Sequence, residues 1–495
     1  MWRNITPYLA KSNIFCIFVA NYKAVYRMTT KIIGREKEQK QLLSLYHSRK
    51  AEFTAVYGRR RVGKTFLIRQ LFENEFVFDL VGLANANTKE QLVNFSLSLN
   101  RVSTTPIKPA KSWLLAFEQL ITLITNSPNE RKVIFMDEIS WLDTPRSGFL
   151  TALEHFWNGW GCSRSDIMLI VCCSATSWIM NKLINNHGGL HNRLTANIYL
   201  RPFSLFETEL YLQSLHCDYS RYDIAECYMT MGGIPYYLSK INGSLSVAQN
   251  IDNLFFAENA ELKNEFQNLY ASLFKNHSDY IRIVEALSLK AKGLSRQEIE
   301  KITGLSSGGG LTSTLQDLEY CGFIRSYNTF GKKKYELLYQ LLDAFTLFYF
   351  KYLAKNEYND AAFWTNSLNT PQHNSWAGYA FEMLVLQHIT EIKQTLGISG
   401  IQSAVSAWKG ETAQIDLLIN RKDGIINLCE IKFSGKEFVI DKNYEANLRN
   451  KLFSFKEATQ TRKAVHLLML TTFGLVKNNY SGIAQKEVIL DDLFK

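Results

Sequence analysis

One loop near the N-terminus constrains the fold of this 495-residue chain more than any other feature. It consists of Gly58, Arg59, Arg60, Arg61, Val62, Gly63, Lys64 and Thr65. These residues match the pattern G-x-x-x-x-G-K-[ST], and a β-rich run (53–57) precedes them while a run with helical spacing (66–72) follows. Strand, glycine loop and helix in this order are typical of a phosphate-binding loop in a parallel α/β sheet.

The residue types of this loop explain the chemistry that it predicts. Gly58 and Gly63 allow the backbone to turn tightly, so that successive N–H groups point at phosphate oxygens. A helix that begins near Lys64 adds the positive end of its dipole. We therefore expect Lys64 to neutralise phosphate charge and the Thr65 hydroxyl to coordinate Mg²⁺, with ATP and Mg²⁺ as ligands.

Two further apolar runs end in polar residues. The run 133–138 ends in Asp137 and Glu138, as a Walker B strand does. We expect Asp137 to hold the metal through water, and Glu138 to orient and deprotonate the attacking water. The run 167–174 ends in Ser174, which fits either a sensor of the γ-phosphate or a plain strand end.

Composition limits the class of protein. With 46% hydrophobic and 21% charged residues, the chain is predicted to be a soluble globular protein of three or four domains. Eight scattered cysteines without a C-x-x-C pair indicate a reduced, cytoplasmic chain without a zinc site. A net charge of +10 favours contact with polyanions such as nucleic acid.

The first 27 residues contain a short apolar run and precede a second methionine, Met28. The apolar run 14–20 is too short to span a bilayer, so no membrane partner is expected. Translation is predicted to start at Met28, which would leave residues 1–27 as an extension outside any folded domain.

Several short motifs accompany the loop in a fixed order. They are Gly34-Arg35-Glu36, Met136-Asp137-Glu138, Ser174-Ala175-Thr176, Asn192-Arg193-Leu194-Thr195, Arg201-Pro202-Phe203 and Gly232-Gly233-Ile234-Pro235. Together with the loop they resemble the archaeal-type ATPases of the AAA-related STAND class, over roughly residues 32–353. The resemblance implies that Arg193 contacts the γ-phosphate or a second subunit of a homo-oligomer, and that a lid helix starts at Gly233–Pro235. A surface arginine before the next strand is the alternative for Arg193.

The pattern becomes helical after Phe203, where a lid over the nucleotide is expected. Predicted helices at 279–290, 295–302 and 311–320 are then followed by two strands that flank three lysines, Lys332 to Lys334. This order predicts a winged helix with lysines at the wing. Helix 311–320 carries no Arg or Lys, so contact with nucleic acid and contact with protein both remain open.

The C-terminal region contains a second group of charged residues. Two predicted strands, 414–419 and 426–433, are joined by a three-residue loop that ends at Gly424. This connection places Asp416 directly opposite Glu430. Two facing carboxylates in an apolar hairpin repel each other unless a cation lies between them.

Strand alternation puts Lys432 on the same face as Glu430, and Glu382 lies on an upstream predicted helix, 378–386. The spacing D-x13-E-x-K with this upstream acid resembles the PD-(D/E)XK nuclease fold. The resemblance implies that Asp416, Glu430 and Glu382 bind Mg²⁺ and that Lys432 orients or activates the attacking water. An exposed hairpin with unremarkable surface charges is the alternative.

The predicted fold class is therefore α/β: a P-loop NTPase parallel sheet with a helical lid, a winged helix and a C-terminal α/β restriction-endonuclease-like domain. The predicted division after the extension is an ATPase core (28–205), a helical lid (206–270), a winged-helix domain (271–352), a linker (353–372) and a nuclease-like domain (373–495).

Two functions fit this organisation. The first is a cytoplasmic ATP-hydrolysing enzyme coupled to a Mg²⁺-dependent nuclease that acts on nucleic acid. The alternative is an ATP-controlled switch that binds DNA or protein through its winged helix, with a non-catalytic nuclease-like scaffold. Glu138 argues against a third hypothesis, an ATP-binding module with negligible turnover, because such a module needs no acid that orients water.

Overall fold

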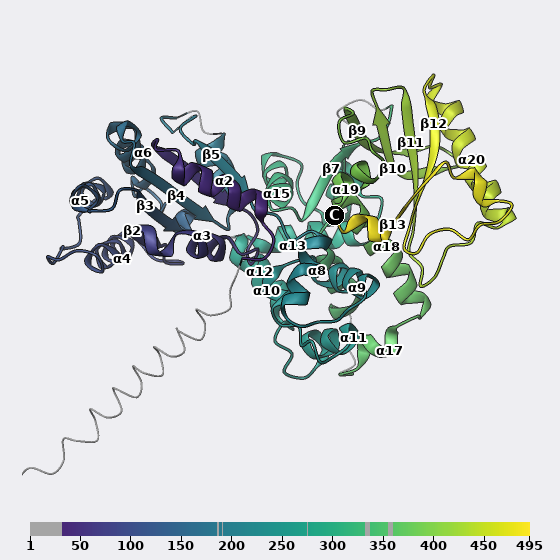
Figure 1. Ribbon diagram of the computed structural model, residues 1–495, viewed down its shortest axis with the longest axis horizontal. Coiled ribbons are helices and arrows are strands. Elements are labelled where there is room, and N and C mark those ends of the chain that lie inside the picture. Colours follow the sequence, from purple (N-terminus) through teal and green to yellow (C-terminus); the bar gives the residue numbers. More distant parts are fainter. Residues whose placement is uncertain (1–31, 186–187, 191, 275, 332–336, 355–359) are drawn as a thin grey trace, which may run out of the picture.

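The computed structural model describes residues 32–495, except 186–187, 191, 275, 332–336 and 355–359. The predicted extension 1–27, the predicted start Met28 and the wing lysines Lys332, Lys333 and Lys334 lie outside the described residues. Figure 1 shows a β-sheet toward each end of the molecule, with helices between the two sheets. No helix in the described part of the chain is both long and apolar enough to cross a membrane.

The N-terminal sheet is parallel, with the strand order β2-β3-β4-β1-β5. Its strands are β1 (Glu52–Tyr57), β2 (Phe76–Val81), β3 (Lys132–Asp137), β4 (Ile167–Cys173) and β5 (Ala196–Tyr199). The predicted parallel α/β sheet is thus confirmed. Because the strands are parallel, the carboxyl ends of β1, β3 and β4 meet at one edge, and the predicted phosphate site follows β1 there.

Helices cover both faces of this sheet (Figure 1). Alternate residues of β4 belong to separate hydrophobic clusters: Met168 packs with α2 and α3, and Leu169 packs with α4, α5 and α6. Near-continuous apolar strands are typical of such a doubly covered sheet. The helices are α2 (Glu36–His47), α3 (Lys64–Phe72), α4 (Thr88–Asn100), α5 (Trp113–Asn126), α6 (Phe149–Gly159) and α7 (Thr176–Ile179).

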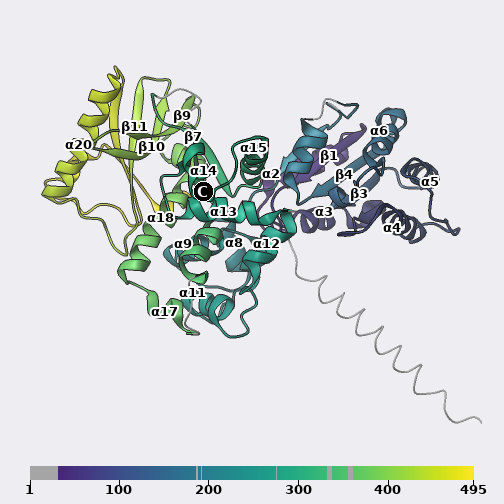
Figure 2. The same ribbon diagram turned by 180° about the vertical axis from the view of Figure 1, so that it is seen from behind.

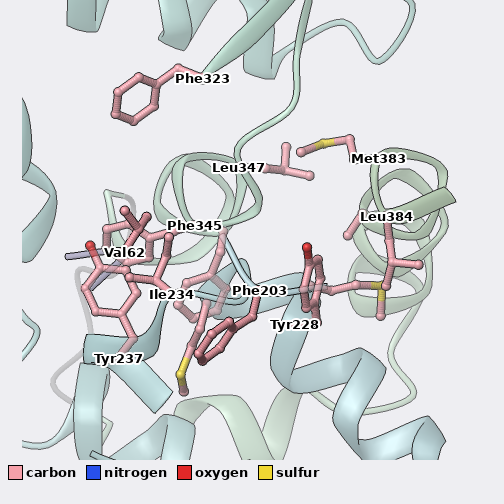
Figure 3. Close-up of a cluster of buried hydrophobic side chains, with 14 of the residues drawn as sticks. Val62, Phe203, Tyr228, Ile234, Tyr237, Phe323, Phe345, Leu347, Met383 and Leu384 are labelled. Atoms are coloured by element: carbon pink, nitrogen blue, oxygen red, sulfur yellow. The ribbon is translucent and has the colours of Figure 1, made fainter. Parts of the chain in front are cut away.

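The next part of the chain is helical, as predicted for residues 206–270. Its helices are α8 (Leu205–Ser214), α9 (Arg221–Met231), α10 (Pro235–Leu238), α11 (Val247–Ile251) and α12 (Glu265–Leu273). Helix α10 begins at Pro235, within the predicted start Gly233–Pro235 of a helix. Figure 3 shows Val62 of the phosphate loop beside Ile234, Tyr237 and Phe345, in one buried cluster. The loop is therefore anchored in the core of the helical region.

A small antiparallel sheet follows, with the order β6-β8-β7. Its elements, in chain order, are α13 (His277–Ser288), β6 (Leu294–Ser295), α14 (Arg296–Thr303), α15 (Gly309–Tyr320), β7 (Ile324–Asn328) and β8 (Leu337–Leu341). The helices and strands follow the predicted order for this region. Helix α15 packs against α7 of the N-terminal region.

The C-terminal sheet is mixed, with the order β13-β12-β11-β10-β9. Strand β10 is antiparallel to its neighbours β9 and β11, whereas β11, β12 and β13 run parallel. The strands are β9 (Ser403–Lys409), β10 (Gln414–Arg421), β11 (Ile425–Lys432), β12 (Ala464–Thr471) and β13 (Lys486–Ile489). The α-helices that follow β8 in the chain are α16 (Ala344–Phe348), α17 (Phe363–Ser367), α18 (Pro371–Gln387), α19 (Ile389–Thr395) and α20 (Lys442–Thr459).

Helix α18 begins seven residues earlier than the predicted 378–386. The side chain of Thr370 caps it by accepting from the backbone N–H of His373, and Pro371 occupies the first turn, where a missing N–H costs nothing. The predicted linker 353–372 therefore contains α17 and the start of α18, and the predicted boundary at residue 373 falls inside a helix.

Candidate functional site

The phosphate loop leaves β1 in a conformation that requires glycine. Gly58 has φ 146°, and a Cβ atom there would lie 2.3 Å from the carbonyl oxygen of Leu200. Gly63 has φ 91° and directly precedes α3, which begins at Lys64. The predicted strand, loop and helix are thus joined as the motif requires.

Lys64 lies back over its own loop. Its Nζ atom donates to the carbonyl oxygens of Gly58 and Arg59 at 2.9 and 3.0 Å, and to Ser174 Oγ at 3.1 Å. The side chain is buried. A buried ammonium group that donates to these three neutral oxygens attracts an anion to this position.

Thr65 and Asp137 face each other across the start of α3 and the end of β3. The Thr65 hydroxyl donates to Asp137 Oδ2 at 2.6 Å. Burial raises the pKa of Asp137, while the hydrogen bond from Thr65 opposes that rise. A hydroxyl and a carboxylate oxygen at one point are ligands suited to Mg²⁺, so these residues fit the predicted ion.

Glu138 adopts a left-handed backbone conformation with φ 47°, which is uncommon outside glycine and turns its side chain toward β4. Its carboxylate accepts from the hydroxyl of Ser174 at 2.5 Å and from the backbone N–H of Ser174 at 3.1 Å. Ser174 therefore joins Lys64 to Glu138, and the three predicted residues lie together.

The arginines of the loop behave differently from one another. Arg59 and Arg61 turn toward other helices and pair with Asp343 and Glu265, respectively, whereas Arg60 is exposed. All three arginines were predicted to lie in the nucleotide site, and neither Asp343 nor Glu265 was predicted as a partner. No local pattern could have done so, because 284 residues separate Arg59 from Asp343.

Arg193 is exposed in the segment before β5. The hydrogen bonds described for Lys64 and Glu138 do not include it. Its predicted role at the γ-phosphate or at a subunit contact stays a prediction.

The C-terminal hairpin has the predicted register. Leu417 pairs with Cys429, so the next position places Asp416 across from Glu430. Glu382 projects from α18, which packs against β11. Burial raises the pKa of Glu382 to about 8, and the negative charges of Asp416 and Glu430 add to this rise. The predicted carboxylates are thus close enough to repel one another.

Helix α20 supplies two residues that the sequence analysis missed. Tyr444 donates to Glu430 Oε1 at 2.6 Å, and Lys451 donates to Glu430 Oε2 at 2.7 Å. Lys432 Nζ lies 3.4 Å from Oε1. Burial alone would raise the pKa of Glu430, but Lys451, Tyr444 and Lys432 lower it below its ordinary value. Tyr444 and Lys451 are seven residues apart and so share one helix face, a spacing that could have indicated them.

Both oxygens of Glu430 are therefore engaged by protein donors. Within the described ranges, no three His, Cys, Asp or Glu side chains are placed so that they could hold a metal ion. In this arrangement Glu382, Asp416 and Glu430 do not fit the predicted Mg²⁺ site.

The segment after β7 contacts the C-terminal sheet. Thr329 bridges to Ala407 of β9, and the backbone N–H of Phe330 donates to the carbonyl of Ala407 at 2.7 Å. The Phe330 ring lies 5.3 Å from that of Phe455 on α20. This part of the predicted wing is therefore occupied by a contact within the chain.

Comparisons with known proteins bear on the phosphate loop. Residues 32–241 match a family model described as an ATPase domain predominantly from Archaea. The uncharacterized protein MJECL04 of Methanocaldococcus jannaschii is 24% identical over 407 residues, which cover 81% of this chain and 87% of that protein.

Two solved structures are similar at lower identity. The Walker-type ATPase PABY2304 of Pyrococcus abyssi has a TM-score of 0.46 and 17% identity, covering 65% of this chain and 96% of its own. The ORC2 protein of Aeropyrum pernix, in complexes with ADPNP and ADP, has a TM-score of 0.42 and 15% identity, covering 65% and 94%. Residues 32–241 are thus similar to an archaeal-type ATPase domain, and their loop has the strand, glycine loop and helix geometry of a phosphate-binding loop.

Proposed function

We propose that this protein hydrolyses ATP at the loop 58–65 and that ATP controls the arrangement of its helical and C-terminal regions. One observation carries the proposal: the hydrogen-bonded chain from Lys64 through Ser174 to Glu138, beside the Thr65–Asp137 pair. It brings a cation, a general base and a set of oxygen ligands to the edge where parallel strands end.

Each residue has a distinct role in this proposal. The loop N–H groups bind phosphate oxygens, and Lys64 exchanges its carbonyl partners for them. Thr65 and Asp137 would hold Mg²⁺, which supplies neutralising charge to the phosphates when bound. Glu138, held by Ser174, accepts the proton of the attacking water.

Two substitutions separate binding from hydrolysis. Lys64→Ala should abolish ATP binding because the phosphates lose their mobile counter-charge, whereas Glu138→Gln should bind ATP and lose hydrolysis. Binding of a fluorescent ATP analogue and release of inorganic phosphate measure the two effects. Lys37→Ala, an exposed lysine on α2, is the matched control. Equal ATP affinity in Lys64→Ala and wild type would contradict the assignment.

For the C-terminal region, the contacts of Glu430 favour the regulatory switch over the nuclease. Lys451 and Tyr444 occupy both oxygens of the acid that the nuclease would need for its metal. The packing of α15, the predicted helix 311–320, against α7 likewise favours protein contact over DNA contact for this helix. In this reading the C-terminal sheet is a scaffold that responds to ATP.

A metal-dependent nuclease acting on nucleic acid remains the second candidate. It is favoured by the register that sets Asp416 across from Glu430, and by the pKa of Glu382, which is raised by burial first and then by the charges of Asp416 and Glu430. Among the described residues, these carboxylates do not fit a metal ion as they lie.

One experiment decides between these roles. Purified protein is incubated with Mg²⁺, with and without ATP, on plasmid, linear and single-stranded substrates. The switch predicts no cleavage under any condition. Cleavage by wild type that is lost in Lys432→Ala but kept in Lys436→Ala, an exposed lysine four residues later, would establish the nuclease instead.

A further inference from the structure

We propose that Glu265 and Asp343, which lie outside the matched ATPase segment 32–241, are positioning residues of the ATP site. The inference rests on the proposed function of the phosphate loop and extends it to the helices that hold the loop. Both acids pair with arginines inside the loop itself, Arg61 and Arg59.

Arg61 shows why the loop needs such support. Its φ of 72° lies in the left-handed region, which is unfavourable for an arginine and persists only where surroundings hold it. Its guanidinium pairs with Glu265 of α12, and the ring centroid of Tyr236 lies 4.1 Å from its Cζ atom. Tyr237 donates to Glu265 Oε1 at 2.7 Å, so the acid is itself fixed in place.

Arg59 is anchored in the same way from a different helix. It is buried, pairs with Asp343, and lies over the ring of Phe323, with Cζ 4.7 Å from the ring centroid. The other carboxylate oxygen of Asp343 accepts from the backbone N–H and the hydroxyl of Thr346, at 2.9 and 2.6 Å. Asp343 is thus oriented toward Arg59 by the first turn of α16.

The two ion pairs, Arg59–Asp343 and Arg61–Glu265, act on the phosphate site through the backbone of the loop. The carbonyl oxygen of Arg59 accepts from Lys64 Nζ at 3.0 Å, and Val62, directly after Arg61, is buried in the cluster of Figure 3. The anchored residues 59, 61 and 62 fix the direction of the loop N–H groups that face phosphate. If Glu265 is removed, Arg61 can relax to an ordinary φ, and if Asp343 is removed, the buried Arg59 loses its counter-charge; either change turns these groups away.

The proposal predicts a selective effect on ATP affinity. Glu265→Gln should raise the Kd and the KM for ATP about tenfold or more, the scale of strain released at a left-handed residue. Asp343→Asn should also raise both, because the buried Arg59 loses its counter-charge. The kcat at saturating ATP should stay within about twofold, because neither acid contacts Glu138 or Ser174 in the described hydrogen bonds. A general loss of folded protein would instead lower kcat per total enzyme.

The matched control is Asp166→Asn in the full chain. Asp166 pairs with Lys132 and Arg164 near the amino end of β3, at the opposite edge of the sheet from the loop. This variant should bind ATP as wild type does. Glu265→Asp retains a carboxylate and should recover most of the lost affinity, which a packing defect would not allow.

The outcomes that overturn the proposal are distinct from those that overturn the ATP site. Wild-type Kd and KM in folded Glu265→Gln and Asp343→Asn would refute the positioning role alone. Failure of the wild type to bind ATP would refute the proposed function. If Asp343→Asn does not fold, since Arg59 would be left buried without a counter-charge, the Arg61–Glu265 pair, in which Arg61 is partly exposed, decides the question by itself.

Discussion

At the scale of single residues, Ser174 shows what the sequence could and could not predict. The apolar run 167–173 predicted where β4 ends, so a polar side chain was expected at this edge. Its bond to Glu138 depends on the left-handed backbone of Glu138, and no pattern in the sequence predicts that conformation. The sequence therefore could not predict the contact with Glu138, and the role of Ser174 as a sensor of the γ-phosphate stays a prediction.

Ser174→Ala should slow ATP hydrolysis about tenfold or more while ATP affinity changes little. The substitution removes the hydroxyl that holds Glu138, whereas Lys64 keeps its two backbone carbonyl partners. Phosphate release at saturating ATP and equilibrium binding measure the two quantities. Ser214→Ala, at an exposed helix end, is the control, and an unchanged kcat in Ser174→Ala would contradict the role.

Glu226 on α9 predicts a pH dependence of stability. Burial, and then the charge of Asp223, raises the pKa of Glu226 to about 7, while a hydrogen bond from Tyr222 opposes the rise. The folded protein thus retains a proton that the unfolded chain releases near pH 4.5. Glu226 therefore contributes its full share of the free energy of unfolding below about pH 4.5, and this contribution is lost as the pH rises through about 7.

The test compares Tm at about pH 5 and about pH 8 in wild type and Glu226→Gln, which cannot titrate. The decrease in Tm with rising pH should be smaller in the variant. His373, 3.9 Å from Glu226, has a pKa lowered by burial, so its own effect has the opposite sign, a loss of stability on acidification. Because His373 is present in both proteins, an identical pH profile would exclude Glu226 as the cause.

At the scale of elements, the sequence predicted how neighbouring strands pair better than it predicted how helices pack against them. The three-residue loop with Gly424 at φ 88° set the hairpin register correctly, because turn geometry fixes it. Helix α20 was missed, although Asp441 caps it and its two buried residues, Leu448 and Phe455, are seven apart. Because this helix was not predicted, Tyr444 and Lys451, which donate to Glu430, were not predicted either.

Lys451→Ala on α20 should increase the response of the protein to Mg²⁺. Lys451 acts as an internal counter-charge for Glu430, and its removal leaves an acid near Asp416 and Glu382 that an ion can neutralise. Added Mg²⁺ without nucleotide should raise Tm more in this variant than in wild type. Lys456→Ala, exposed on the same helix, is the control, and an equal Mg²⁺ response in all three proteins would contradict the prediction.

At the scale of the whole molecule, the β7–β8 hairpin contacts both the phosphate loop and the C-terminal sheet with its helix α20. At its base, Phe323 lies under Arg59 of the phosphate loop, and its carbonyl accepts from the backbone N–H of Asp343 at 3.2 Å. At its far end, Phe330 lies against Ala407 and Phe455 of the C-terminal region. Figures 1 and 2 both place β7 beside β9. Contacts between residues so distant in sequence depend on tertiary packing, which periodicity and spacing do not encode.

Phe330→Ala should therefore change ATP affinity although Phe330 lies far along the chain from the loop. Coupling between two sites is reciprocal. If ATP alters the docking of the hairpin on β9, loss of that docking must alter the Kd for ATP by the same factor. Typical coupling changes an affinity about fivefold or more. Equilibrium binding of ATP to Phe330→Ala, wild type and Phe453→Ala measures it, the last being an exposed aromatic on α20. Hydrogen exchange of β9 with and without ATP, in the Glu138→Gln background that retains nucleotide, reports the reverse direction. A wild-type Kd in Phe330→Ala, together with β9 exchange that ATP does not change, would show that the two centres are energetically independent, and that the hairpin only joins them structurally.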